Sequence, residues 1–167
     1  LIALIADTGM RLAEGAGLLR SDFIGQDGIL CVNIRSHPWR SLKTASSTRI
    51  IPLVGSAKWA AERILTQPAD SKFAFPNYND GQRTSANSAS AALNKWLKGN
   101  IGEGYTMHSF RHSSRDRLRA VECPSDVIDQ IGGWLTQGVG ASYGLGHNHG
   151  TLTRWLVAIV GALNLEA

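Results

Sequence analysis

The sequence predicts an α+β domain that is mostly helical and carries one small antiparallel sheet of three strands. Three features lead to this prediction. Apolar residues recur at helical spacing along most of the chain, whereas they alternate with other residues at 29–34, as in a half-buried strand. Small and polar residues such as those at 45–47 separate the segments as turns would. The 167 residues suffice for one domain with its own core, and no repeat or linker divides them.

The first part of the chain predicts two helices followed by the sheet. The apolar residues at 1–6 indicate the end of a buried helix, and an interruption at 8–9 precedes a second helix at 10–19. Alternation defines the first strand, and a turn of small residues separates the other two. The expected strands are 29–34, 39–44 and 48–53. Lys43 would then lie beside the last hairpin.

Five further helices are expected after the sheet. Ser56 is a suitable N-cap, Gly99 a suitable C-terminal stop, and prolines mark two other breaks. Residues 67–83 have the composition of a loop, in which Phe73 and Phe75 would be buried anchors. The expected helices are 56–66, 85–98, 107–121, 125–131 and 151–163.

Composition narrows the class of protein only moderately. The net charge is +4 and the isoelectric point about 9.4, which favours an anionic partner. Cys31 and Cys123 are far apart and show neither a disulfide framework nor metal-ligand spacing, so a reducing cytosol is expected. No apolar run approaches the roughly 20 residues that span a bilayer. The chain opens at Leu1 inside a predicted helix, so we expect a fragment of a longer protein.

The helix at 107–121 concentrates positive charge on one face. His108, Arg111, His112 and Arg115 are spaced i, i+3, i+4 and i+7, so they share a face opposite the apolar residues. Two interpretations are open. The face is either a solvated basic surface or part of a binding site for an anion.

Arg11 lies among apolar residues, and a buried guanidinium group needs a partner. Glu14 at i+3 could provide a local ion pair with no ligand involved. Alternatively, Arg11 points into a cleft and meets a phosphate, which the planar guanidinium fork binds well.

Three other residues are ordinary when taken singly. Lys43 would be a surface lysine and Trp134 a core aromatic, while Tyr143 lies in a glycine-rich stretch that suits either an exposed loop or a mobile nucleophile. His147 and His149 form an H-x-H pair without a third convergent ligand, so we expect a loop without metal.

The joint order of these residues is far more specific. The chain carries R-x-x-E, a lysine before a strand R-I-I-P-L, then H-x-x-R, and finally G-G-W with a tyrosine nine residues beyond the tryptophan. This pattern resembles the tyrosine recombinase (phage integrase) family over nearly the whole chain. The G-G-W…Y region is Cre-like, since most integrases have histidine where Trp134 stands. The resemblance implies the tyrosine-recombinase catalytic core for residues 1–167, without the N-terminal DNA-clamping domain of complete recombinases.

The resemblance also implies a chemistry and a role for each residue. Tyr143 would attack a DNA phosphodiester and form a 3′-phosphotyrosyl bond, while Arg11 and Arg111 stabilise the charge on the phosphate. Lys43 would protonate the leaving 5′-oxygen, and His108 would assist proton transfer and bind a phosphate oxygen. No cofactor, metal ion or ATP is implied.

Trp134 would position and stabilise the phosphate, and Glu14 would support the first arginine and the histidine. The implied partner is double-stranded DNA bearing a recombination site, on which the protein forms a homotetramer from monomers, in the cytoplasm or nucleoid of a bacterial host. The helix within 151–167 would dock on a neighbouring protomer in that assembly, or else on its own core. Arg35, Arg40, Lys95, Lys98, Arg115 and Arg119 are candidate contacts to the DNA backbone.

Three other functions stay open at this point. A non-catalytic DNA-binding remnant of a prophage integrase would bind DNA without forming a covalent adduct. A type IB topoisomerase-like enzyme would relax plasmids instead of recombining them. A structural or protein-interaction domain would have no cleft that gathers Arg11, Lys43, His108 and Arg111.

Overall fold

The computed structural model of the chain describes residues 1–68, 70–135 and 146–163. Within these residues the chain is mostly helical with one three-stranded antiparallel sheet, which confirms the predicted fold class. Short 3₁₀ helices lie at Arg20–Asp22, Ala45–Ser47 and Pro76–Tyr78. The α-helices are α1 (Ile2–Thr8), α2 (Leu12–Ala16), α3 (Gly55–Thr66), α4 (Ala86–Asn100), α5 (Met107–Ala120), α6 (Ser125–Gly132) and α7 (His149–Leu163).

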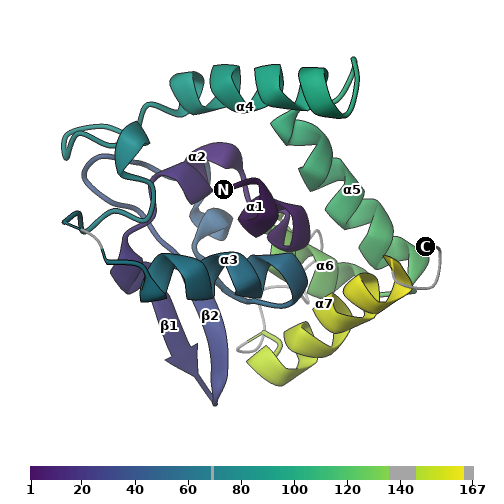
Figure 1. Cartoon of the computed structure of the whole chain (residues 1–167). Coiled ribbons are helices and arrows are strands. Elements are labelled where there is room, and N and C mark those ends of the chain that lie inside the picture. The colour runs from purple at the N-terminus through teal and green to yellow at the C-terminus, as the bar shows by residue number, and fades with distance from the viewer. Residues whose placement is uncertain (69, 136–145, 164–167) are drawn as a thin grey trace.

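Helix α1 lies at the centre of the molecule (Figure 1). It packs against α2, α3, α5 and α7, and its Leu4 and Ile5 are fully buried. Helix α4 spans the top of the view and packs against α2 and α5, so that α2, α4 and α5 frame a corner beside the start of the chain. Burial of α1 on several sides fits its almost uninterrupted apolar sequence.

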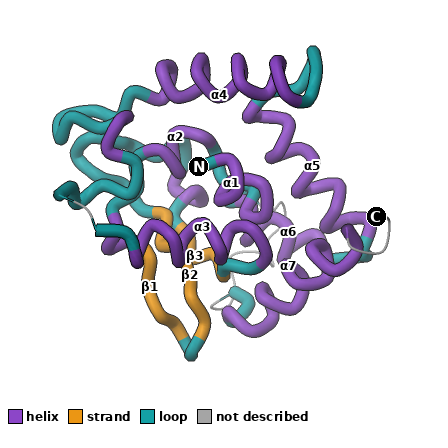
Figure 2. The backbone as a smooth tube through the Cα atoms, in the orientation of Figure 1, coloured by secondary structure: helices purple, strands orange, loops and turns teal. Residues whose placement is uncertain are grey.

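The sheet is formed by β1 (Phe23–Gln26), β2 (Ile29–Ile34) and β3 (Arg49–Pro52) in that order (orange in Figure 2). Both pairs of neighbours are antiparallel. Asp27 and Gly28 form the two-residue turn between β1 and β2, both with positive φ, as a hairpin turn of the primed type requires.

One strand prediction is wrong. Residues 39–44 form no strand; His37 and Arg40 make a single isolated bridge, after which the chain bends into the 3₁₀ helix at Ala45–Ser47. The remaining strand of the sheet is instead β1, which precedes β2 in the chain and lies outside the predicted strands. The Asp27-Gly28 pair is a strong hairpin signal, and it predicts a strand on both of its sides.

Several helix ends also differ from the prediction. The second helix is only Leu12–Ala16, and α4 continues through Gly99 to Asn100. Ser56 is inside α3 and is not its cap; its N–H and hydroxyl both donate to the carboxylate of Asp7. The Asp7 carboxylate of α1 therefore accepts from a backbone N–H in the first turn of α3, where negative charge is favoured.

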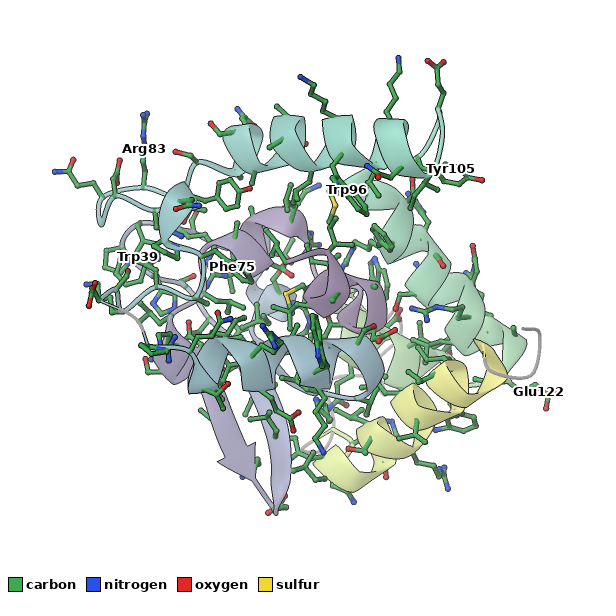
Figure 3. The ribbon with its side chains drawn as sticks, in the orientation of Figure 1. Trp39, Phe75, Arg83, Trp96, Tyr105 and Glu122 are labelled. Carbon is green, nitrogen blue, oxygen red and sulfur yellow. The ribbon has the colours of Figure 1, made fainter. Side chains whose placement is uncertain are left out.

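The expected aromatic anchors of the 67–83 loop are present. Phe73 is buried and pairs with Leu19 in an isolated bridge, and Phe75 is half-buried. In contrast, Trp96 and Tyr105 are about half exposed near the corner where α4 leads into α5 (Figure 3).

Candidate functional site

Arg11 precedes the first residue of α2 and is held by two groups. Its backbone N–H donates to one carboxylate oxygen of Glu14 (2.9 Å), and its Nη1 donates to the other oxygen (2.7 Å) and to Ser47 Oγ (2.9 Å). The local ion pair considered from the sequence is therefore present. Ser47, 36 residues further along the chain, adds a contact from the loop before β3 that orients the same guanidinium group.

Glu14 is almost fully buried and also accepts from Arg49 Nη2 at 2.9 Å. Burial by itself would raise the pKa of Glu14, but the charge of Arg49 and hydrogen bonds from Arg49 and Arg11 hold that pKa below its ordinary value. Glu14 is thus ionised and shared by two arginines.

Arg49 is a site residue that the sequence analysis missed. Besides Glu14, it donates from Nε to the carbonyl of Ile131 (2.8 Å) and from Nη1 to the carbonyl of Ser47 (2.6 Å). It thereby joins β3 to the end of α6. The signal was available, because an arginine that opens an apolar strand must find partners when the strand is buried.

Arg111 is buried, with 5% of its surface exposed. Its Nη1 donates to the carbonyl of Gly9 (2.7 Å) and its Nη2 to the carbonyl of Gly132 (2.8 Å). Burial, followed by the charges of Arg11 and Arg49, lowers the pKa of Arg111 to about 10, so it stays charged at neutral pH. A uniformly solvated basic face is therefore wrong for this helix, although His108 and His112 are exposed.

Trp134 contacts the guanidinium groups of two arginines on α5. Arg111 Cζ lies 4.2 Å and Arg115 Cζ 4.7 Å from the centre of its ring, at cation–π distance. The two preceding glycines make this packing possible. A Cβ at Gly132 would collide with the indole. Gly133 has a φ of 64°, and a Cβ there would lie 2.7 Å from Arg49 Nη1, which is too close for a side chain.

Three of the predicted site residues line one cavity of about 340 Å³. Arg11 reaches it from the junction of α1 and α2, and His108 and Arg111 reach it from α5. We call it the arginine cavity. Its other lining residues are Met10, Leu12, Ser90, Asn94, Thr106 and Met107.

The pKa of His108 reflects its burial and the positive charges around it. Burial, then the charges of His112, Arg111, Arg11 and Lys43, lower the pKa of His108 below its ordinary value. His108 is therefore mainly neutral at pH 7. Lys43 is exposed in the loop before β3 and does not line the arginine cavity. Its charge nevertheless contributes to the lowered pKa of His108.

Tyr143, the predicted nucleophile, lies outside the described residues. The arrangement thus comprises Arg11, His108 and Arg111 in one cavity, Lys43 nearby, Trp134 against Arg111, and Glu14 behind Arg11. Such a cavity, with fixed cations and a neutral imidazole, is suited to a phosphate diester.

One of the expected contacts to the DNA backbone is wrong. The guanidinium nitrogens of Arg40 are all buried, so Arg40 cannot reach a phosphate in this arrangement. Lys95 is exposed, whereas Arg35, Lys98, Arg115 and Arg119 each pair with a carboxylate. Among residues 1–68, 70–135 and 146–163, no three histidine, cysteine or acidic side chains are grouped to hold a metal ion.

Fold and cavity together define a class of helical α+β domain with a cavity that Arg11, His108 and Arg111 line. The model of the phage integrase family matches residues 1–143, a range that ends at Tyr143. The chain therefore belongs to the phage integrase family, which confirms the resemblance drawn from the motifs.

One solved structure is similar over almost the whole chain. It is the Tn1549 transposon integrase in complex with transposon right end DNA, with a TM-score of 0.59 and 19% identity. The match covers 99% of the present chain and 58% of that chain, so the present chain spans little more than half its length. At this identity the likeness concerns the fold. No curated protein matches the chain, and no helix in the described part is long and apolar enough to cross a membrane.

Proposed function

We propose that this chain is the catalytic domain of a site-specific DNA recombinase that cleaves and rejoins strands through a 3′-phosphotyrosyl intermediate. The observation that carries the proposal is the arginine cavity, in which Arg11, His108 and Arg111 converge from distant parts of the sequence. Membership of the phage integrase family supports it independently.

In this mechanism Arg11 and Arg111 bind the non-bridging oxygens of the scissile phosphate. Two backbone carbonyls already orient Arg111, and Glu14 and Ser47 orient Arg11, so little reorganisation is needed when charge builds up. Preorganised donors of this kind typically stabilise a transition state by about 3–4 kcal/mol each.

The nucleophile is Tyr143, and its proton must leave as the bond to phosphorus forms. A phenol has a reference pKa of about 10, so the phenolate costs about 4 kcal/mol at pH 7. His108 is neutral there and can help to take up this proton while it hydrogen-bonds a phosphate oxygen. Lys43 gives a proton to the 5′-oxygen as its bond to phosphorus breaks.

The intermediate keeps the energy of the phosphodiester, so a 5′-hydroxyl of another strand can reverse the step without ATP. The arginines supply the charge stabilisation, and no step in this scheme requires a metal ion or a cofactor. Trp134 holds Arg111 in place and Glu14 holds Arg11.

The partner in this proposal is double-stranded DNA with a recombination site, in the cytoplasm of a bacterial host. Monomers would assemble into a homotetramer on it. Helix α7 packs on its own chain in the structure, with Leu152, Leu156 and Ile159 buried. We propose that this segment, within 151–167, exchanges onto a neighbouring protomer when the tetramer forms.

The test is a nicked suicide substrate incubated with the full-length protein. Covalent protein–DNA adduct that disappears in Tyr143→Phe is the expected result. Binding of the site without any adduct would instead identify a non-catalytic remnant. Relaxed plasmid without recombined product would identify a topoisomerase-like enzyme, and absence of DNA binding would leave a structural domain.

A further inference from the structure

Helix α6 holds a short segment that follows the predicted nucleophile in the chain. The side-chain amide of Gln130 donates to the carbonyl of His147 (2.9 Å) and accepts from its N–H (2.8 Å), so it satisfies both backbone groups of one residue. One helical turn earlier, Asp126 Oδ2 lies 2.8 Å from Nε2 of the same histidine. We call these contacts from Gln130 and Asp126 the His147 clamp.

The neighbouring residues are shaped to fit the clamp. Gly146 has a φ of 74°, and a Cβ there would lie 3.0 Å from Gln130 Oε1, so only glycine fits without strain. On the other side, His149 Nδ1 lies 3.2 Å from a carboxylate oxygen of Asp27, in the β1–β2 turn. Residues 146–149 are therefore held between α6 and the sheet.

The same helix also holds the arginines of the site. The carbonyls of Ile131 and Gly132, at the end of α6, accept from Arg49 and Arg111. Gln130 is the residue immediately before these two. Three consecutive residues of α6, 130–132, thus make the contacts to His147, Arg49 and Arg111.

Chain connectivity then limits where the nucleophile can be. Tyr143 is three residues before Gly146. Three residues span at most about 11 Å even when fully extended, so the His147 clamp acts on the chain close to the predicted nucleophile.

We propose that Gln130, together with Asp126, is a positioning residue that fixes the anchor of the tyrosine-bearing segment relative to Arg111. This inference rests on the proposed function, since it concerns the step in which Tyr143 attacks. It assigns to α6 the task of coupling the anion-binding side chains to the nucleophile. Loss of the His147 clamp would leave DNA binding intact but make the reactive approach rarer.

The experiment compares Gln130→Ala with wild type in the full-length protein, in single turnover on the nicked substrate. We expect adduct formation to slow by about tenfold or more, with unchanged affinity for the DNA. The unfolding midpoint should fall only slightly, because the two lost hydrogen bonds are only partly buried. Gln130→Glu still accepts from the His147 N–H but places a carboxylate oxygen against the His147 carbonyl, so its rate should also fall below that of wild type. Gln82→Ala, on an exposed loop, is the matched control and should behave as wild type.

Amide hydrogen exchange at His147 gives a readout that does not depend on activity. We expect it to become faster in Gln130→Ala and in Gly146→Ala, and not in Gln82→Ala. A Gln130→Ala protein with faster exchange and the wild-type cleavage rate would overturn the positioning role. An equal loss of cleavage rate, DNA affinity and thermal stability would also overturn it, since the residue would then only be structural. Absence of adduct in wild type would instead refute the proposed function itself.

Discussion

At the scale of single residues, Arg111 derives its position from the whole fold and not from its helix alone. Arg111 donates to the carbonyl of Gly9, 102 residues away in the chain, and to that of Gly132, 21 residues away. The indole of Trp134 lies against its guanidinium group. Such a guanidinium group is fixed before any ligand arrives, which is the condition for strong electrostatic stabilisation.

Arg111→Lys should slow adduct formation by about 10²–10³-fold, because an ammonium group cannot present the fork to two phosphate oxygens. It should also lower the free energy of unfolding by about 1–3 kcal/mol, since a carbonyl of Gly9 or Gly132 loses its donor. Single-turnover kinetics and urea unfolding measure the two effects. Arg119→Lys, exposed on the same helix, is the control, and a normal cleavage rate in Arg111→Lys would contradict the phosphate role.

The pKa of His108 should be measurable directly by NMR titration. Burial, and then the nearby cations, disfavour the protonated ring, so the pKa should lie below the ordinary value of about 6.5. Lys43→Gln removes one of these cations and should raise the pKa of His108. Lys98→Gln should leave that pKa unchanged, because Lys98 is not among the groups that act on His108.

The cleavage rate should fall as the pH drops through the pKa of His108, because the ring then gains its proton. Equal pKa values in wild type and Lys43→Gln would show that Lys43 is remote from the site.

At the scale of elements, Glu14 joins α2 to β3, because it pairs with Arg11 on one side and Arg49 on the other. Glu14→Gln would leave Arg49 buried without its counter-charge, and we expect a loss of about 3–5 kcal/mol in the free energy of unfolding. Glu103→Gln, which breaks the exposed pair with Lys98, should cost less than about 1 kcal/mol.

The pH dependence of this effect has a definite sign. The pKa of Glu14 is lowered in the folded protein, so its contribution is present above the unfolded pKa and is lost as the pH falls through the folded pKa. The difference between wild type and Glu14→Gln should therefore shrink in acid. A difference that stays constant from pH 7 to the acid transition would argue against an ionised Glu14.

Helix α7 contributes to the core of its own chain through three fully buried aliphatic side chains. Leu156→Ala should lower the free energy of unfolding by about 2–5 kcal/mol, whereas Val157→Ala, on the exposed face, should have little effect. Chemical denaturation of the isolated chain measures both. If α7 left this position in the isolated chain, the two variants would have similar stability.

At the scale of the whole molecule, assembly should depend on DNA. We expect sedimentation of the full-length protein to give a monomer alone and a tetramer on a DNA with two recombination sites. A truncation that lacks 151–167 should fail to form the tetramer. It also uncovers core side chains, so Leu4→Ala, a fully buried position in α1 outside the exchanged segment, serves as the control for lost stability. Normal assembly and strand joining by the truncated protein would refute the exchange of α7.

The sequence predicted most helices, because their apolar periodicity is strong. Its joint motif order named candidate site residues, of which Arg11, His108 and Arg111 line one cavity. The strand prediction for residues 39–44 is wrong, because these residues lack the alternation of a strand. The signal for β1 is a short one, the Asp27-Gly28 turn that joins it to β2. Arg40 resembles any surface arginine in the sequence, and its burial depends on segments that pack around it.

By itself, the sequence determined the family, the helical α+β class and the set of residue types that could handle a phosphate. These follow from periodicity and motif order, which are local properties of the chain. Only the tertiary structure decided that Arg11, His108 and Arg111 share one cavity, that Arg49 completes the network around Glu14, and that α6 holds His147. Each of these depends on contacts between residues far apart in the chain, and such contacts are set by packing of the core, which spacing along the sequence does not encode.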